Sequence, residues 1–149
     1  LEIFTDREGK IILKKYSPRM ELNAFAGQYA EAMAQSTGLV VCITDRDQVI
    51  AVSGGAKKEL LQKTISPQLE QAINERTSIL AGKDDKTFIN LVDEELEGVT
   101  AQVVAPIICE GDAIGAVALL SRESRAKFGD METKLAATAA GFLGRQMEG

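Results

Sequence analysis

Side chains that could carry out chemistry are few in this chain. It has no histidine and two cysteines, Cys42 and Cys109. The lack of histidine removes the usual general base near neutral pH, the Ser-His and Cys-His nucleophile pairs, and the commonest transition-metal ligand. Both cysteines lie in apolar stretches without CxxC or other metal-ligand spacing, so we expect buried, reduced thiols. The sequence therefore gives no indication of an enzyme, and we expect no catalytic residue, metal site or cofactor.

Two segments could bind ions, but neither has the spacing that such sites need. Gly54-Gly55 precedes Lys57 and could offer backbone amides to a phosphate, yet the GxxxxGK[ST] spacing is missing. A flexible loop before a short helix is the better interpretation. The acidic residues at 93–97 lack the D-x-[DN]-x-[DN]-G pattern of a calcium loop, so we expect solvated carboxylates.

A more informative set is formed by polar residues within, or at the ends of, stretches otherwise built from Val, Ile, Leu and Ala. Several could converge on one face of a sheet and orient a ligand in an apolar cleft. The alternative is that threonines at sheet edges and a solvent-facing glutamine explain the pattern. The candidate ligand-binding residues are Thr44, Ser53, Asn90, Thr100 and Gln102.

Turn signals and hydrophobic periodicity predict the elements that would position these residues. Ser17-Pro18 and Ser66-Pro67 are typical helix starts, and Asp130 can cap a last helix. The segment Glu110-Gly111-Asp112 joins two long apolar strands as a hairpin. The predicted helices cover residues 18–35, 57–62, 66–76 and 130–147, and the predicted strands cover residues 39–44, 49–53, 87–92, 99–108 and 113–120. This order predicts an α+β fold with one antiparallel sheet and segregated helices.

The first 17 residues stand apart from this domain. Residues 1–4 and 10–16 are rich in β-branched and aromatic residues, and the turn between them contains Gly9, which predicts a β-hairpin. A lone hairpin is marginally stable in water, and the chain opens with Leu. We therefore expect residues 1–17 to be the end of an upstream domain whose remainder is missing, and residues 18–149 to form a second domain.

The charge is distributed unevenly between these two parts. Residues 1–19 hold five Lys or Arg against three Asp or Glu, whereas residues 20–149 hold twelve against nineteen. An acidic body repels phosphate, so DNA contact is expected only through the missing upstream segment. No run approaches the length of a membrane helix and no leader is recognisable, so we expect a cytoplasmic protein without membrane contact.

Several separate stretches together carry a resemblance to a known family. They are LEIFTD and IILKKYSP at the start, SPRMELNAFAGQYAEAM, VVCITDRDQVIAVSGGAKKELLQKTIS, VVAPIICEGDAIGAVALLS and ETKLAATAAGFLGRQME. The first two resemble the last strands of AbrB-type swapped-hairpin DNA-binding domains. In this order, all of them resemble a family of sporulation transcription regulators that joins an AbrB-like domain to a GAF sensor domain.

The resemblance implies a GAF fold, with terminal helices on one face of a central antiparallel sheet and a small-molecule pocket on the other. The family's DNA-contacting arginines lie in an upstream basic stretch that is absent here, so no DNA-binding residue can be carried over. The sequence also lacks the N-K-x-x-x-F-x-x-x-D-E pattern of cyclic-nucleotide GAF domains and a Cys-His context for a bilin chromophore. Neither of those ligands is expected, and the ligand remains unknown.

Apolar stripes on the first and last helices predict self-association. One sheet can cover only one stripe of each helix, and Ala136, Ala137, Ala140, Gly141 and Gly144 would allow another helix to approach closely. We expect a dimer through these helices, and a tetramer in the intact protein because the DNA-binding hairpins of the family also dimerise. The candidate interface residues are Leu22, Phe25, Tyr29, Met33, Leu135, Ala139, Phe142 and Leu143.

The predicted function is therefore part of a sporulation transcription regulator whose GAF domain senses a small molecule and assembles subunits. Two alternatives stay open. A small GAF-type enzyme, such as a free-methionine-sulfoxide reductase, would need reactive cysteines on mobile loops. A pure oligomerisation module would bind no ligand, and the sequence does not separate it from a sensor.

Overall fold

The computed structural model describes residues 18–124 and 126–148. The predicted N-terminal hairpin and its assignment to an AbrB-like domain lie outside the described residues. The helices are α1 (Pro18–Thr37), α2 (Lys57–Leu60), α3 (Pro67–Asn74) and α4 (Asp130–Gln146). The strands are β1 (Val40–Thr44), β2 (Val49–Ser53), β3 (Ile79–Gly82), β4 (Ala101–Cys109) and β5 (Asp112–Ser121).

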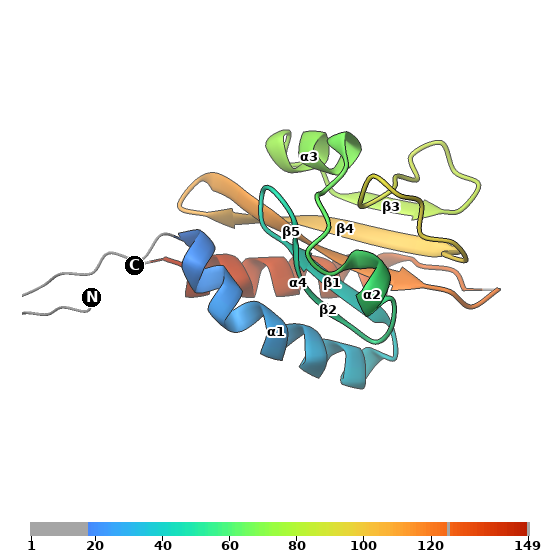
Figure 1. Cartoon of the computed structure of the whole chain (residues 1–149), viewed down its shortest axis with the longest axis horizontal. Helices are drawn as coiled ribbons and strands as arrows, with labels where there is room; N and C mark the ends of the chain where they lie inside the picture. Colours follow the sequence, from blue (N-terminus) through green and yellow to red (C-terminus); the bar gives the residue numbers. More distant parts are fainter. Residues whose placement is uncertain (1–17, 125, 149) are drawn as a thin grey trace, which may run out of the picture.

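The five strands form one antiparallel sheet in the order β2-β1-β5-β4-β3. Helices α1 and α4 lie against one face of this sheet, and α2 and α3 lie over the other, as Figure 1 shows. The predicted α+β class with a central antiparallel sheet is confirmed. Among the described residues, no helix combines the length and the apolarity needed to span a membrane.

Alternation along the strands divides the core into two parts. In β4, Val103 and Ile107 pack with α1 and α4, whereas Val104 packs under α2 and α3. Successive side chains of a strand point to opposite faces, so Gln102 points to the same face as Val104. We refer to the face that packs against α1 and α4 as the helical face, and to the other as the opposite face.

The small residues of α4 pack on the sheet rather than being left for a second subunit. Ala136, Ala140 and Gly144 are buried, and a Cβ atom added to Gly144 would lie 2.1 Å from the carbonyl oxygen of Ile108. Only a glycine allows α4 to approach β4 this closely. The expectation that these small residues face another helix is therefore wrong for the three buried positions, while Ala137 and Gly141 are exposed.

One predicted strand is wrong. Residues 87–92 form no strand but an irregular segment with a single bridge between Ile65 and Val92. The strand at this edge is β3, Ile79–Gly82, which is absent from the strands that the sequence predicts. It is four residues long, and its Leu80 is 44% exposed, so neither its length nor its hydrophobic pattern distinguishes it from a connection.

The helix starts show one confirmed prediction and one correction. Ser66 caps α3, because its Oγ accepts a hydrogen bond from the Leu69 backbone N–H at 3.0 Å. Asp130 does not cap α4 but is its first residue. The N-cap is Gly129, whose backbone N–H donates to Glu132 Oε1 at 2.7 Å.

Candidate ligand-binding site

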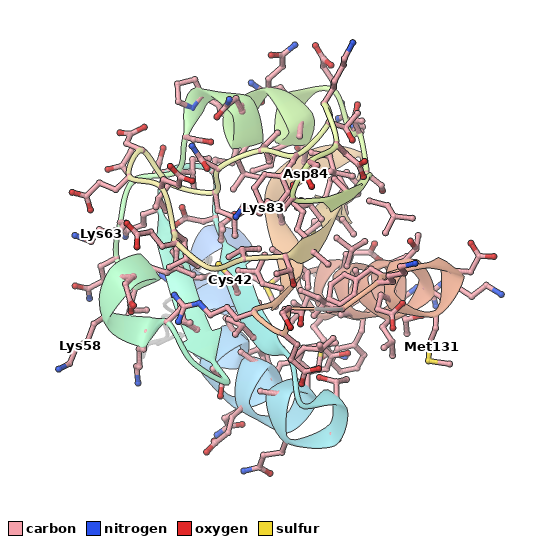
Figure 2. All side chains as sticks on the ribbon, turned by 90° about the vertical axis from the view of Figure 1, so that its right-hand side faces the viewer. Cys42, Lys58, Lys63, Lys83, Asp84 and Met131 are labelled. Atoms are coloured by element: carbon pink, nitrogen blue, oxygen red, sulfur yellow. The ribbon has the colours of Figure 1, made fainter. Side chains whose placement is uncertain are left out.

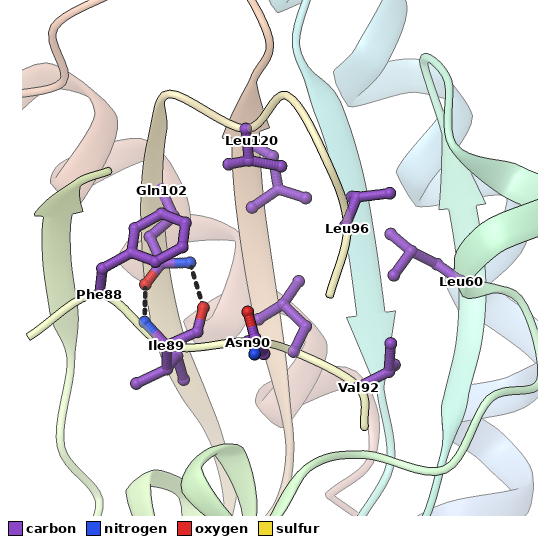
Figure 3. Close-up of a pocket in the computed structure, with 10 residues that line it drawn as sticks. Leu60, Phe88, Ile89, Asn90, Val92, Leu96, Gln102 and Leu120 are labelled. Carbon is purple, nitrogen blue, oxygen red and sulfur yellow. Dashed lines mark hydrogen bonds between the residues drawn. The ribbon is translucent and has the colours of Figure 1, made fainter. Parts of the chain in front are cut away.

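A small cavity lies between the opposite face of the sheet and residues 83–99, which we refer to as the covering segment. Its floor includes Gln102 of β4 and Leu120 of β5, and Leu60 of α2 closes one side (Figure 3). Phe88 and Leu96 of the covering segment lie above this floor. The free volume is about 10 Å³, roughly what one water molecule requires, so the cavity is closed to any metabolite in this conformation.

Gln102 holds the covering segment to the sheet. Its Nε2 donates to the carbonyl oxygen of Ile89 at 3.0 Å, and its Oε1 accepts from the Ile89 backbone N–H at 2.9 Å. Figure 3 shows this pair of bonds between the side chain and the segment. The side chain is 1% exposed, so both of its polar groups depend on these bonds. The carboxamide thus forms with the backbone of Ile89 the two hydrogen bonds that a neighbouring strand would otherwise form.

Ser66 provides a second attachment, at the two residues that follow Ile89. Its Oγ donates to the carbonyl oxygen of Asn90 at 2.6 Å, and its backbone N–H donates to that of Leu91 at 2.9 Å. The same hydroxyl caps α3, so it joins the start of this helix to the covering segment. From the sequence, Ser66 is expected only to start a helix, and the Ser-Pro pair gives no sign of its partner 24 positions away.

The structure brings two of the five candidate ligand-binding residues to this cavity. Asn90 and Gln102 line it, whereas the other three have different surroundings. Thr100 donates to the carbonyl oxygen of Glu123 at 2.6 Å and so joins the ends of two strands. Ser53 lies on edge strand β2, beside a surface hollow between α1 and α2. Thr44 is fully buried at the end of β1, and its Oγ1 has no hydrogen-bond partner among the described residues.

Both cysteines are buried within strands, as predicted. Cys42 lies in β1, where desolvation raises the pKa of its thiol to about 12. Figure 2 shows it inside the domain, while Lys58, Lys63 and Met131 project from the surface. Cys109 ends β4 and is 2% exposed. A thiol with so high a pKa remains protonated at neutral pH and is a poor nucleophile.

The acidic residues of the covering segment are exposed. Glu94 lies 3.9 Å from the Nζ of Lys63, a surface ion pair. Within the described part of the chain, no group of three or more His, Cys, Asp or Glu side chains is placed to hold a metal ion.

The eight candidate interface residues separate into three groups. Leu22, Ala139 and Leu143 are buried in the domain's own core and are not available to a second subunit. Phe25 and Phe142 are 43% and 45% exposed. The other three, Tyr29, Met33 and Leu135, are half-buried beside the core. Desolvation raises the pKa of Tyr29, and its ring stacks on Phe142 with centroids 5.1 Å apart. An apolar strip therefore remains where α1 meets α4.

A family model described as "Stage V sporulation protein T C-terminal, transcription factor" matches residues 21–148. The chain belongs to this family. Stage V sporulation protein T of Bacillus subtilis (strain 168) is 48% identical over 148 residues, which cover 99% of this chain and 81% of that protein. The sporulation-regulator resemblance found in the sequence is confirmed at this level.

Solved structures of other proteins share the fold of this chain. A GAF domain of a putative membrane protein from Geobacter sulfurreducens has a TM-score of 0.65 at 17% identity, covering 87% of this chain and 94% of that one. The type II free methionine-R-sulfoxide reductase from Thermoplasma acidophilum has a TM-score of 0.67 at 10% identity, with coverages of 88% and 95%. At such low identities these likenesses establish a GAF fold and no activity.

Proposed function

We propose that this chain is the regulatory part of a sporulation transcription factor, in which the GAF domain binds a small molecule beneath the covering segment. The observation that carries the proposal is the match of residues 21–148 to the C-terminal domain of this transcription-factor family. DNA binding resides, in this proposal, in a segment upstream of these residues.

The cavity supports the sensing role. It lies under an irregular segment on the opposite face of the sheet, and apolar side chains surround two polar ones, Asn90 and Gln102. An apolar pocket with a few placed polar groups is the usual form of a small-molecule site. Because its free volume is about 10 Å³, ligand entry must displace the covering segment, and this displacement would be the signal.

The terminal helices support an assembly role. Phe25 and Phe142 expose large aromatic surfaces where α1 and α4 meet. Exposed aromatic groups of this kind are typical of protein interfaces. We infer that two copies pair through this strip and that the pairing orients the DNA-binding segments of the whole protein.

The reductase alternative has less support. Both cysteines are buried in strands, and the pKa of Cys42 is raised to about 12, whereas thiol catalysis needs an accessible thiolate. A non-enzymatic role also agrees with a transcription-factor family.

Native mass spectrometry of the full-length protein, purified from its own host, tests the sensing proposal. We expect a non-covalent adduct that is released on denaturation and, when added back, raises the melting temperature of residues 1–149. A ligand-free protein would instead favour the second candidate, an assembly module without a ligand. The closed cavity is the observation in favour of that candidate.

A further inference from the structure

Ile89 lines the cavity, and both of its backbone polar groups are bound by the side chain of Gln102. Gln102 is held in the sheet by its backbone, since Ala81 and Leu120 are its neighbours on the two adjacent strands. Its side chain leaves the sheet plane and bonds both backbone groups of Ile89. The Ile89 side chain meanwhile packs beside the apolar cluster of the opposite face. The carboxamide thus binds an N–H donor and a C=O acceptor of one amino-acid residue, while the apolar cluster receives the side chain of the same residue.

Entry of a small molecule requires Ile89 to leave. Among the described residues, the hydrogen bonds that tie 86–89 to another part of the domain are the two to Gln102. The next stretch is tied separately by Ser66 and by the bridge between Ile65 and Val92. Release of Gln102 would therefore free Ile89 and Phe88 while residues 90–92 remain attached.

A released Gln102 constrains what can replace Ile89. A buried carboxamide without partners is costly, so the incoming molecule must supply both a donor and an acceptor. The spacing that Gln102 now binds is that of H–N–C–C=O, the unit of a peptide. None of the residues lining the cavity has an ionisable side chain. A zwitterionic amino acid would lose the hydration of both its charges there and would gain only the neutral carboxamide of Gln102, with no oppositely charged partner.

We propose that the site takes a neutral, apolar, peptide-like molecule, which displaces Ile89 and forms the same two hydrogen bonds with Gln102. Suitable compounds are apolar amino acids blocked at both ends and small cyclic peptides. This inference rests on the proposed sensing function and adds the chemical class of the ligand. Gln102 then has two roles: it holds the covering segment closed, and it recognises the ligand by hydrogen bonds.

The test is an NMR titration of ¹⁵N-labelled residues 1–149 with three probes that share one side chain. The first is N-acetyl-leucine methylamide, which is neutral and has both an N–H donor and a C=O acceptor. The second is free leucine, which is charged at both ends. The third is methyl 4-methylpentanoate, which is neutral and has the C=O acceptor but no N–H donor. We expect the diamide to shift the Ile89 backbone and Gln102 side-chain signals, and to bind at least tenfold more tightly than either other probe.

Variants of Gln102 then distinguish hydrogen bonding to the ligand from the space that the side chain fills. Gln102→Met keeps the length of the side chain and should weaken diamide binding at least tenfold and speed hydrogen exchange at Ile89 at least tenfold. Binding of the ester should weaken by a smaller factor, because the ester can form only one of the two hydrogen bonds with Gln102. Gln102→Asn keeps the amide but shortens its reach, and decides the question if the methionine variant does not fold. The matched control is Thr100→Val, two positions earlier, where the hydroxyl donates to the carbonyl oxygens of Ser121 and Glu123 and not to the covering segment. It should bind the diamide like the wild type.

Equal binding of diamide and ester, or an unaltered diamide affinity in the Gln102 variants, would overturn the role of Gln102. Tighter binding of leucine, or no response to the diamide, would overturn the ligand class. Neither result would decide the sensing proposal itself, because that depends on the adduct retained by the full-length protein. A retained adduct that is charged, with no diamide binding, would reject the inference and keep the sensor.

Discussion

The ring of Tyr29 in α1 stacks on the ring of Phe142 in α4, with centroids 5.1 Å apart and planes inclined by 15°. This contact joins the first and last helices of the domain, which are more than 100 positions apart in sequence. It also leaves Phe142 45% exposed, with Phe25 exposed on α1. The same pair therefore closes the domain and provides the surface proposed for assembly.

Glutamate at this strip should separate the proposed dimer. We expect Phe25→Glu and Phe142→Glu to sediment as monomers at micromolar concentration, because an unpaired carboxylate buried at an interface costs several kcal/mol. Phe142→Glu should also lose about 1 kcal/mol of stability with the stacked pair. Leu80→Glu is the matched control, since Leu80 is 44% exposed on edge strand β3. A wild type that is already monomeric, or variants that stay dimeric, would refute the assembly proposal.

Substitution by alanine at Gly144 and at Gly141 of α4 should change the free energy of unfolding in opposite directions. A Cβ at Gly144 would meet the Ile108 carbonyl at 2.1 Å, so Gly144→Ala should destabilise the domain by about 1–3 kcal/mol as α4 is pushed from β4. At Gly141, none of the described residues places an atom within 4 Å of an added Cβ, so Gly141→Ala should stabilise the domain by about 0.4–1 kcal/mol. Urea unfolding measures both. A neutral Gly144→Ala would show that α4 does not need this close approach.

The buried thiol of Cys42 should be inert in the folded domain. Its pKa is raised from 9.0 to about 12 by desolvation, so at about pH 8 it should react with iodoacetamide only when urea unfolds the chain. As the pH rises, the thiol of Cys42 loses its proton in the unfolded chain before it does so in the folded domain. Burial of the neutral thiol therefore contributes fully to the free energy of unfolding below pH 9, and this contribution is lost as the pH rises towards about 12. Peptide mapping of the alkylated residues provides the measurement. Rapid labelling of the native protein would restore the case for thiol chemistry.

Residues 1–149 should bind DNA weakly and without sequence preference. Residues 20–149 carry twelve basic against nineteen acidic side chains, so we expect a dissociation constant on the order of 10⁻⁴ M or weaker at physiological salt. Fluorescence anisotropy with operator and scrambled duplexes measures this. Adding the upstream segment to which we assign DNA contact should restore specific binding, whereas nanomolar binding by residues 1–149 would contradict that assignment.

The sequence was sufficient for the elements with strong local signals. The Ser66-Pro67 start, the long hairpin around Gly111 and the apolar run of β1 all appear where the pattern predicts them. Burial of both cysteines also followed from the apolar strands that contain them. In these cases the hydrophobic period and the turn chemistry are properties of neighbouring residues, so the sequence displays them directly.

The tertiary structure decided which polar residues meet. Gln102 and Thr100 look alike in sequence, as polar residues near the start of one strand, yet Gln102 binds Ile89 and Thr100 binds Glu123. Ile89 itself looks like part of an apolar strand, because the partner that replaces a strand there is a side chain 13 positions away. Likewise, the small size of Gly144 suggests close approach of another subunit, whereas in the structure it is β4 that lies against this residue. Each of these contacts joins residues distant in sequence, and local patterns contain no information about which distant partner a side chain will meet.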